Sequence, residues 1–151
     1  MKVRAYVDGS FNEQKSSYGG GVVILDVPGV DTPIQAKACG NNAMFVSYRN
    51  ISGEIMAVLK AMQIISSING VDEIDIYHDY LGVAYWVNGK WQARKDLSRM
   101  YKAEMQKYAG KFKINFIHVK GHSGDYYNNV ADTLAREATW EVDRKEDDVN
   151  A

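Results

Sequence analysis

The spacing of three strand-like segments near the start of the chain places the strongest constraint on its fold. In the first segment every second residue is apolar, which is the pattern of a strand with one buried face. The segments cover residues 2–7, 19–25 and 34–39. The links between them are too short for the helical crossover that parallel neighbours require, so we expect an antiparallel meander.

Helical and strand-like segments alternate in the rest of the chain. Apolar residues recur at helical spacing after Ser52, which is placed to cap the first helix. The predicted helices cover residues 54–65, 80–109 with an interruption at Asn88 and Gly89, and 128–139; the predicted strands cover residues 74–78 and 114–119. The order βββαβα(α)βα predicts an α/β fold with a mixed five-stranded sheet, three antiparallel strands followed by two parallel ones, flanked by helices.

The length and composition indicate one globular domain. A chain of 151 residues falls within the roughly 100–200 residues usual for a domain. Its 46% hydrophobic and 25% charged residues exclude disorder as the dominant state. We therefore predict a single domain over residues 1–140. Acidic side chains crowd the remaining residues, 141–151, which we predict to form a flexible tail.

The sequence also indicates in which compartment of the cell the protein works. No apolar run approaches the roughly 18–20 residues needed to cross a bilayer, so we expect no membrane association. The first residues show no apolar core of a secretory signal. Cys39 is the only cysteine, which excludes an internal disulfide and a cysteine-built zinc site. We therefore expect a cytoplasmic protein.

The charge is unevenly distributed along the chain. The formal net charge is −1, yet residues 86–120 hold 9 basic and 2 acidic side chains, a local balance of +7. Such a block is either a solvated helix face or a confined patch that binds phosphate groups. Charge alone favours the solvated helix face.

Four carboxylates occupy positions that a purely structural sequence rarely gives to acids. They are Asp8, Glu54, Asp79 and Asp132. Each has a simple interpretation: Asp8 forms a turn with Gly9, Glu54 favours the helix dipole, Asp79 caps the next helix, and Asp132 pairs with Arg136. Together they suggest a shared site, because strand ends and the edges of packed helices converge on one crevice in an open α/β sheet.

Clustered carboxylates repel one another unless a proton or a cation is shared between them. Oxygen ligands suit Mg²⁺ or Mn²⁺ better than zinc. Two such ions about 3.5–4 Å apart can hold the attacking and leaving oxygens of a phosphodiester displacement. The sequence contains no phosphate-binding P-loop, nucleophile elbow or dinucleotide motif, and the glycine run at 19–21 is weak support for a phosphate cradle.

His122 lies between two glycines in the loop before the last predicted helix. A plain exposed loop histidine is one interpretation. The other is a group that moves protons or helps a product to leave when the loop faces the carboxylates.

These residues resemble those of the ribonuclease H family, type 1. The matching pieces are VDGS at 7–10, GEIMAVLKA at 53–61, IYHDYLGV at 76–83 and VKGHSGDYYNNVADTLARE at 119–137. The resemblance implies a ribonuclease H-like fold in which Asp8, Glu54, Asp79 and Asp132 bind metal, and it places His122 on the family's mobile histidine. It also implies an endonuclease that hydrolyses the RNA strand of RNA–DNA hybrids with two Mg²⁺ ions. The products would carry 5′-phosphate and 3′-hydroxyl ends, and Mn²⁺ is a substitute for Mg²⁺.

The resemblance also suggests how a hybrid would be bound. The candidates for contacts to RNA 2′-hydroxyls are Ser10, Asn12, Asn50 and Ser52, for which turn and capping chemistry is the alternative. The candidates for gripping the DNA strand by charge and stacking are Lys90, Trp91, Arg94 and Lys95. This basic segment is shorter than the handle of some family members, so we expect a weaker grip. Trp86 is assigned to the core, and His78 has no assigned role.

Three other functions fit these residues less well. A junction resolvase or integrase-like nuclease shares the first acids but matches the KGHSG loop poorly. A non-catalytic hybrid-binding module would not need all four acids and His122. An acidic cation-binding scaffold leaves the basic block unexplained. We expect a hybrid duplex as the partner, no protein partner, and a monomer.

Overall fold

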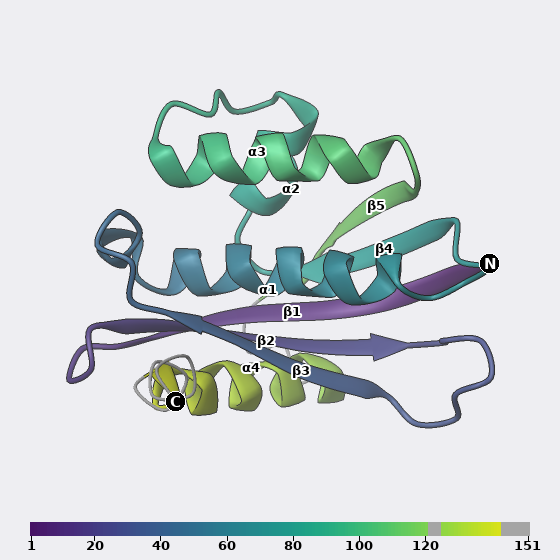
Figure 1. The fold of residues 1–151 in the computed structure, drawn as a ribbon, viewed down its shortest axis with the longest axis horizontal. Helices are drawn as coiled ribbons and strands as arrows, with labels where there is room; N and C mark the ends of the chain where they lie inside the picture. Colours follow the sequence, from purple (N-terminus) through teal and green to yellow (C-terminus); the bar gives the residue numbers. More distant parts are fainter. Residues whose placement is uncertain (121–124, 143–151) are drawn as a thin grey trace.

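The computed structural model describes residues 1–120 and 125–142 and contains one five-stranded sheet (Figure 1). The strands are β1 (Lys2–Asn12), β2 (Ser17–Leu25), β3 (Ile34–Gly40), β4 (Glu73–His78) and β5 (Lys113–His118). Their order is β3-β2-β1-β4-β5, with antiparallel pairing among β1, β2 and β3 and parallel pairing of β4 with β1 and β5. The predicted mixed sheet is confirmed.

Helices cover both faces of the sheet (Figure 1). They are α1 (Asn50–Ser66), α2 (Gly82–Asn88), α3 (Asp96–Ala109) and α4 (Tyr126–Thr139), with a short 3-10 turn, η1 (Val46–Tyr48), before α1. The larger core lies between the sheet and α1, where α3 adds Leu97, Tyr101 and Met105. A smaller core lies under α4 on the other face and includes Val23 and Leu134. The sheet is therefore the middle of three layers.

The glycine run predicted as a weak candidate for binding phosphate has a packing role instead. A Cβ on Gly21 would lie 2.0 Å from the carbonyl oxygen of Ala131 in α4. A Cβ on Gly20 would lie 2.4 Å from the carbonyl oxygen of Gly53 in α1. Successive residues of β2 thus let the two helices contact the strand backbone from opposite faces.

Two local predictions from the sequence, and one of the simple interpretations of the acids, are wrong. β1 does not end at Asp8 but continues to Asn12, because β2 keeps pairing with it to the hairpin. Ser52 does not cap α1, which begins at Asn50; the Ser52 hydroxyl donates to the Phe45 carbonyl at 2.6 Å. Asp79 does not cap α2, whose first flanking residue is Leu81.

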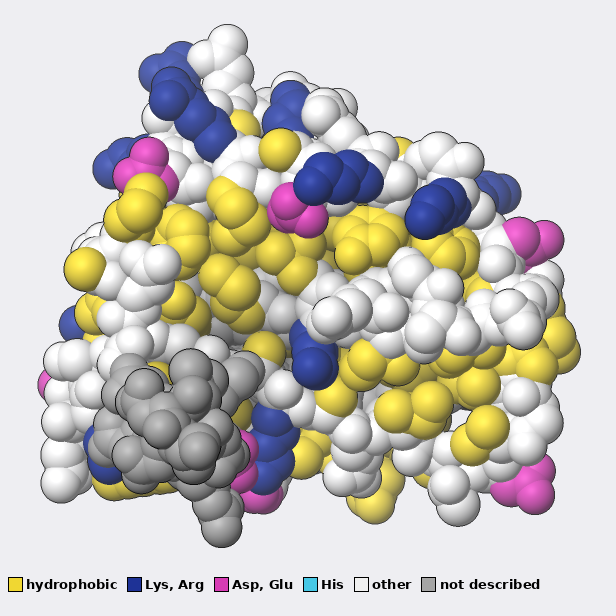
Figure 2. Space-filling model, viewed as in Figure 1, with side chains coloured by type: hydrophobic (Ala, Val, Ile, Leu, Met, Phe, Trp, Pro, Cys, Tyr) yellow, Lys and Arg dark blue, Asp and Glu magenta, His cyan; other side chains and the backbone are white. Residues whose placement is uncertain are grey.

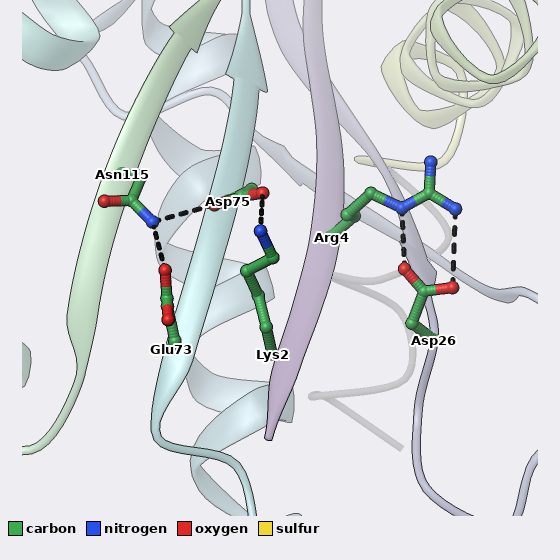
Figure 3. Close-up of polar contacts among 6 residues, drawn as sticks. All are labelled: Lys2, Arg4, Asp26, Glu73, Asp75 and Asn115. Carbon is green, nitrogen blue, oxygen red and sulfur yellow. Dashed lines mark hydrogen bonds and ion pairs between the residues drawn. The ribbon is translucent and has the colours of Figure 1, made fainter.

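Polar side chains tie the strands together at the end of the sheet where β1 and β4 begin (Figure 3). The Asn115 amide donates to both Glu73 and Asp75 at 2.8 Å, joining β5 to β4. Lys2 pairs with the buried Asp75 at 3.1 Å, which joins β4 to β1. Arg4 pairs with Asp26 just after β2. The contacts from Asn115 and Lys2 supply partners for Asp75, whose buried charge would otherwise destabilise the fold.

The chain remains in contact with the sheet just after α4. Glu141 pairs with Lys37 of β3 at 2.9 Å, and Val142 is buried. Residues 143–151 of the predicted tail lie outside the described residues, so its flexibility and the domain boundary stay predictions. Within the described part of the chain, no helix has the length and apolar character to cross a membrane.

The close approach of α4 to β2 gives a test of this packing. We expect Gly21→Ala to lower the free energy of unfolding by about 3 kcal/mol or more, because the new methyl group overlaps backbone that cannot move aside easily. Gly110→Ala is the matched control, since nothing lies within 4 Å of its Cβ position and its φ is −79°. Urea unfolding should show little loss or a gain of up to about 1 kcal/mol for the control. Equal stability of the two variants would contradict the packing.

Candidate active site

The predicted carboxylates meet where the parallel strands β1 and β4 stop pairing. The last paired residues are Tyr6 and Tyr77, and Asp8 and Asp79 each lie two residues beyond them. Glu54 reaches the same place from α1. One carboxylate oxygen from each of Asp8, Glu54 and Asp79 lies within 4.8 Å of the others. The predicted convergence of these three acids is therefore present in the structure.

Asp132 joins the group from the opposite face of the sheet. It lines a pocket of about 160 Å³ together with Asp8 and Asp79. Asp132 also pairs with Arg136 one turn later in α4, which was its simple structural interpretation. The two roles coexist, because the pocket still contains the side chain and its negative charge still acts on Asp8.

Glycine allows Glu54 to lie this close to β1. A Cβ on Gly9 would lie 2.2 Å from the Asn50 carbonyl oxygen and 2.3 Å from the Glu54 nitrogen. Gly9 is therefore needed for the approach of α1 and not for the turn that the Asp8–Gly9 pair suggested. Its amide donates to the Asp8 carboxylate at 2.9 Å, which helps to orient that side chain.

Burial makes the charged forms of two carboxylates unfavourable. Burial, with the nearby charges of Asp8 and Asp79 adding to it, raises the pKa of Glu54 to about 8, against a hydrogen bond from the Tyr80 amide. Burial also raises the pKa of Asp8 to about 7, and the charges of Asp132 and Asp79 act in the same direction. Such a group is stable only when protons or a cation balance its charge.

The ligand atoms at the site fit a hard divalent cation. Four carboxylates line or surround the pocket, and amide side chains from Asn50, Asn128 and Asn129 complete its lining. Oxygen ligands in this number are typical of Mg²⁺ and Mn²⁺ sites. Within the described residues, no cysteine or histidine belongs to the group of acids close enough to share an ion.

The structure places the four predicted RNA-contacting residues in different surroundings. Asn50 is exposed and lines the pocket, and Ser10 lies two residues beyond Asp8 on β1. The Asn12 side chain accepts from the Lys15 amide at 3.1 Å, which is the turn chemistry given as its alternative. Ser52 is fully buried, and its hydroxyl donates to Phe45. The structure does not bring Ser52 to the pocket surface.

The predicted DNA-gripping residues form a surface beside the carboxylates. Arg94 and Lys95 line a pocket of about 310 Å³ together with Tyr80 and Trp86. Trp91 lines an adjoining pocket of about 340 Å³ that also contains Glu54 and Asp79. Figure 2 shows Lys and Arg side chains gathered over the α2–α3 layer above a band of hydrophobic side chains.

The other predictions for this segment concern Trp86 and Lys90. Trp86 is half-buried and packs against the main core, as predicted. The Lys90 ammonium lies 4.5 Å above the centre of the Tyr85 ring. Among the described residues, no carboxylate pairs with Lys90, Arg94 or Lys95, so their charges stay available to a polyanion.

Sequence reasoning missed several residues of the site. Asn128 and Asn129 lie four and three residues before Asp132, so helical spacing could have identified them as neighbours on one face of α4. Tyr80 holds Glu54 through its backbone amide, a role that no side-chain pattern reveals. His122 lies outside the described residues.

This chain is similar to known proteins over most of its length. The family model for RNase H matches residues 1–139. A ribonuclease H of Francisella philomiragia is 33% identical over 95% of this chain and 94% of its own length. A ribonuclease H of a Wolbachia strain from Drosophila simulans is 29% identical over 91% and 94% of the two chains.

Solved structures show the same fold. RNase H1 of the archaeon Halobacterium salinarum has a TM-score of 0.73 and 22% identity, covering 94% of this chain and 100% of its own. The RNase H1 named LC11, solved in complex with an RNA/DNA hybrid, has a TM-score of 0.72 and 19% identity, covering 92% and 97% of the two chains. Since the family model spans the whole sheet and all four carboxylates, this chain belongs to the ribonuclease H family and is a nuclease of that family.

Proposed function

We propose that this protein is an endonuclease that hydrolyses the RNA strand of RNA–DNA hybrids with two Mg²⁺ ions, leaving 5′-phosphate and 3′-hydroxyl ends. The observation that carries the proposal is the meeting of Asp8, Glu54 and Asp79 within 4.8 Å, from three different elements. The family and the hybrid-bound relative support the substrate. Mn²⁺ is the proposed substitute ion.

Each carboxylate has a distinct place in the proposed chemistry. Asp8 is the central ligand, because it belongs to the three-acid group and the nearby charge of Asp132, on the other side, also raises its pKa. Glu54 and Asp79 complete one side of the site, and Asp132 completes the other. Bound there, the ions would activate water and stabilise the charge that develops on the phosphate and the leaving oxygen. His122 is proposed to carry protons or assist product release.

The proposed hybrid lies across the carboxylates and the adjoining aromatic and basic surface. Asn50, Ser10 and Asn12 are the proposed contacts to RNA 2′-hydroxyls, which distinguish RNA from DNA. Trp91 lines the pocket that contains Glu54 and Asp79, and Arg94 and Lys95 line the next one, so this surface can follow the DNA strand. One chain supplies all four carboxylates, so we propose a monomer that needs no protein partner. Its proposed location is the cytoplasm.

A cleavage assay with an Asp8→Asn variant tests the proposal. We expect wild-type protein to cut a labelled RNA paired with DNA when Mg²⁺ is present, and to leave it intact with EDTA. The same RNA alone or paired with RNA should stay uncut. Asp8→Asn should lower cleavage by more than about 100-fold, because even the loss of an outer partner of a metal ligand costs up to this factor.

Asp31→Asn is the matched control, since Asp31 is an exposed acid outside the site. It should cleave like wild type. Full activity of Asp8→Asn would overturn the metal assignment, and a folded wild-type protein that cuts nothing with Mg²⁺ or Mn²⁺ would favour a hybrid-binding module.

The raised pKa values of Asp8 and Glu54 predict how stability depends on pH. Their protonated forms stabilise the fold, so this contribution is present at low pH and is lost as the pH rises through about 7 and 8. Between about pH 5.5 and 8.5 we expect the Tm of metal-free protein to fall by roughly 4 °C or more. Mg²⁺ should raise Tm more at the higher pH, because it then displaces fewer protons.

The double variant Asp8→Asn, Glu54→Gln separates this effect from other titrating groups. Calorimetry should show a shallower fall of its Tm with pH and little response to Mg²⁺. A fall as steep as that of wild type would place the pH dependence elsewhere in the molecule.

The basic surface is tested by replacing Lys90, Arg94 and Lys95 with glutamine. We expect a higher KM for the hybrid and a salt dependence whose slope is smaller by about 2–3, because each lost phosphate contact removes close to one released counterion. The control replaces Lys107, Lys111 and Lys113 with glutamine. Lys107 lies near the other end of α3, Lys111 lies between α3 and β5, and Lys113 is the first residue of β5. Equal salt slopes for the two triple variants would mean that the hybrid lies elsewhere.

A further inference from the structure

The turn between β4 and α2 carries Asp79 and is held by side chains on both sides. The Tyr80 amide donates to Glu54 Oε2 at 2.8 Å. The Tyr80 carbonyl oxygen lies 3.0 Å from Nδ1 of His78. The residues before and after Asp79 are therefore joined to each other and to α1.

The direction of the His78 contact follows from the chemistry of its partner. A carbonyl oxygen only accepts hydrogen bonds, so Nδ1 of His78 carries the proton and donates it. This fixes one tautomer and one orientation of the ring.

The surroundings of His78 make this contact rigid. The side chain is only 2% exposed, and its ring lies edge-on to Phe116, with centroids 6.0 Å apart, and beside His118 at 5.9 Å. The Val119 amide donates to the His78 carbonyl at 2.7 Å, which ties the same residue to the end of β5. His78 can therefore act as a fixed support for the turn.

Asp79 depends on this support more than its neighbours in the site do. Asp8 accepts from the Gly9 amide and Glu54 accepts from the Tyr80 amide. Among the described residues, no hydrogen bond or ion pair holds the carboxylate of Asp79, which is exposed. Its position is therefore set by the backbone of the turn on which it lies.

We propose that His78 is a positioning residue that holds Asp79 in place for metal binding through its hydrogen bond to the Tyr80 carbonyl. The proposal rests on the proposed metal-binding role of the carboxylates. His78 had no assigned role on the sequence alone.

Two variants of nearly equal shape separate this role from core packing. In His78→Asn the side-chain amide can occupy the place of Nδ1 and donate to Tyr80, whereas His78→Leu has the same branching and no donor. Leucine suits a buried site better than asparagine, so a purely structural role predicts that the leucine variant performs as well or better. A positioning role predicts the reverse order for metal binding.

The direct readout is a Mn²⁺ titration of the full chain without substrate, followed by the electron paramagnetic resonance signal of the free ion. We expect His78→Leu to bind Mn²⁺ about 10- to 100-fold more weakly than wild type, the usual cost of losing a partner that orients a metal ligand. His78→Asn should stay within a few-fold of wild type, although its Tm is the lower of the two. Cleavage should show a lower kcat for His78→Leu at fixed Mg²⁺, with the KM for hybrid unchanged.

Each outcome either supports or overturns the positioning role of His78. Wild-type Mn²⁺ affinity in His78→Leu would overturn the proposal, and so would an equal loss in both folded variants, since that would assign the effect to the ring. These results leave the proposed nuclease function standing as long as wild type binds the ion and cuts hybrid. A wild-type protein that binds no Mn²⁺ would overturn both proposals together.

Discussion

The contact of two helices with bare strand backbone is the constraint on which the rest of this structure depends. Gly9 and Gly20 are neighbours in the β1–β2 pairing, and without Cβ atoms they let α1 lie directly against the strands. Gly21, paired with Asp8, does the same for α4 on the other face. Glu54 and Asp132 lie on these two helices, so the spacing of the carboxylates is determined by backbone contacts that any larger residue would open. Close packing of this kind transmits small changes in volume, because protein interiors have few voids to absorb them.

The same packing buries carboxylates whose negative charge must be balanced by protons or by a cation. Glu54 is 4% exposed, and burial raises its pKa and that of Asp8 into the neutral range. If stability were the only requirement, neutral groups in place of these acids would make the fold more stable. Arg136 pairs with Asp132, but Arg94 and Lys95 line a separate pocket, where they can meet phosphates. The separation of the two charges is what a metal-assisted enzyme acting on a polyanion requires.

The sequence predicts the sheet and the convergence of the acids well, because both follow from patterns that local physics controls. Apolar periodicity and link length distinguish antiparallel from parallel neighbours, and the end of the buried strand over 74–78 locates Asp79. The errors arise where distant contacts override local signals. Asp8–Gly9 resembles a turn, yet pairing with β2 extends the strand and the glycine serves α1. Ser52 resembles a helix cap, yet η1 leads into α1 one turn earlier. The Ser52 hydroxyl instead donates to the Phe45 carbonyl. The support of the Asp79 turn by His78 is invisible in the sequence, because it depends on a backbone carbonyl placed by tertiary structure.

The most direct test of the central claim is the anomalous diffraction of Mn²⁺ in crystals of an Asp132→Asn variant bound to an RNA–DNA hybrid. We expect a peak among Asp8, Glu54 and Asp79, beside the phosphate of the RNA strand. In crystals of wild-type protein with an uncleavable hybrid, a second peak should lie on the Asp132 side of Asp8, about 3.5–4 Å from the first. Mn²⁺ bound elsewhere, or a hybrid whose RNA strand lies away from these carboxylates, would contradict this claim.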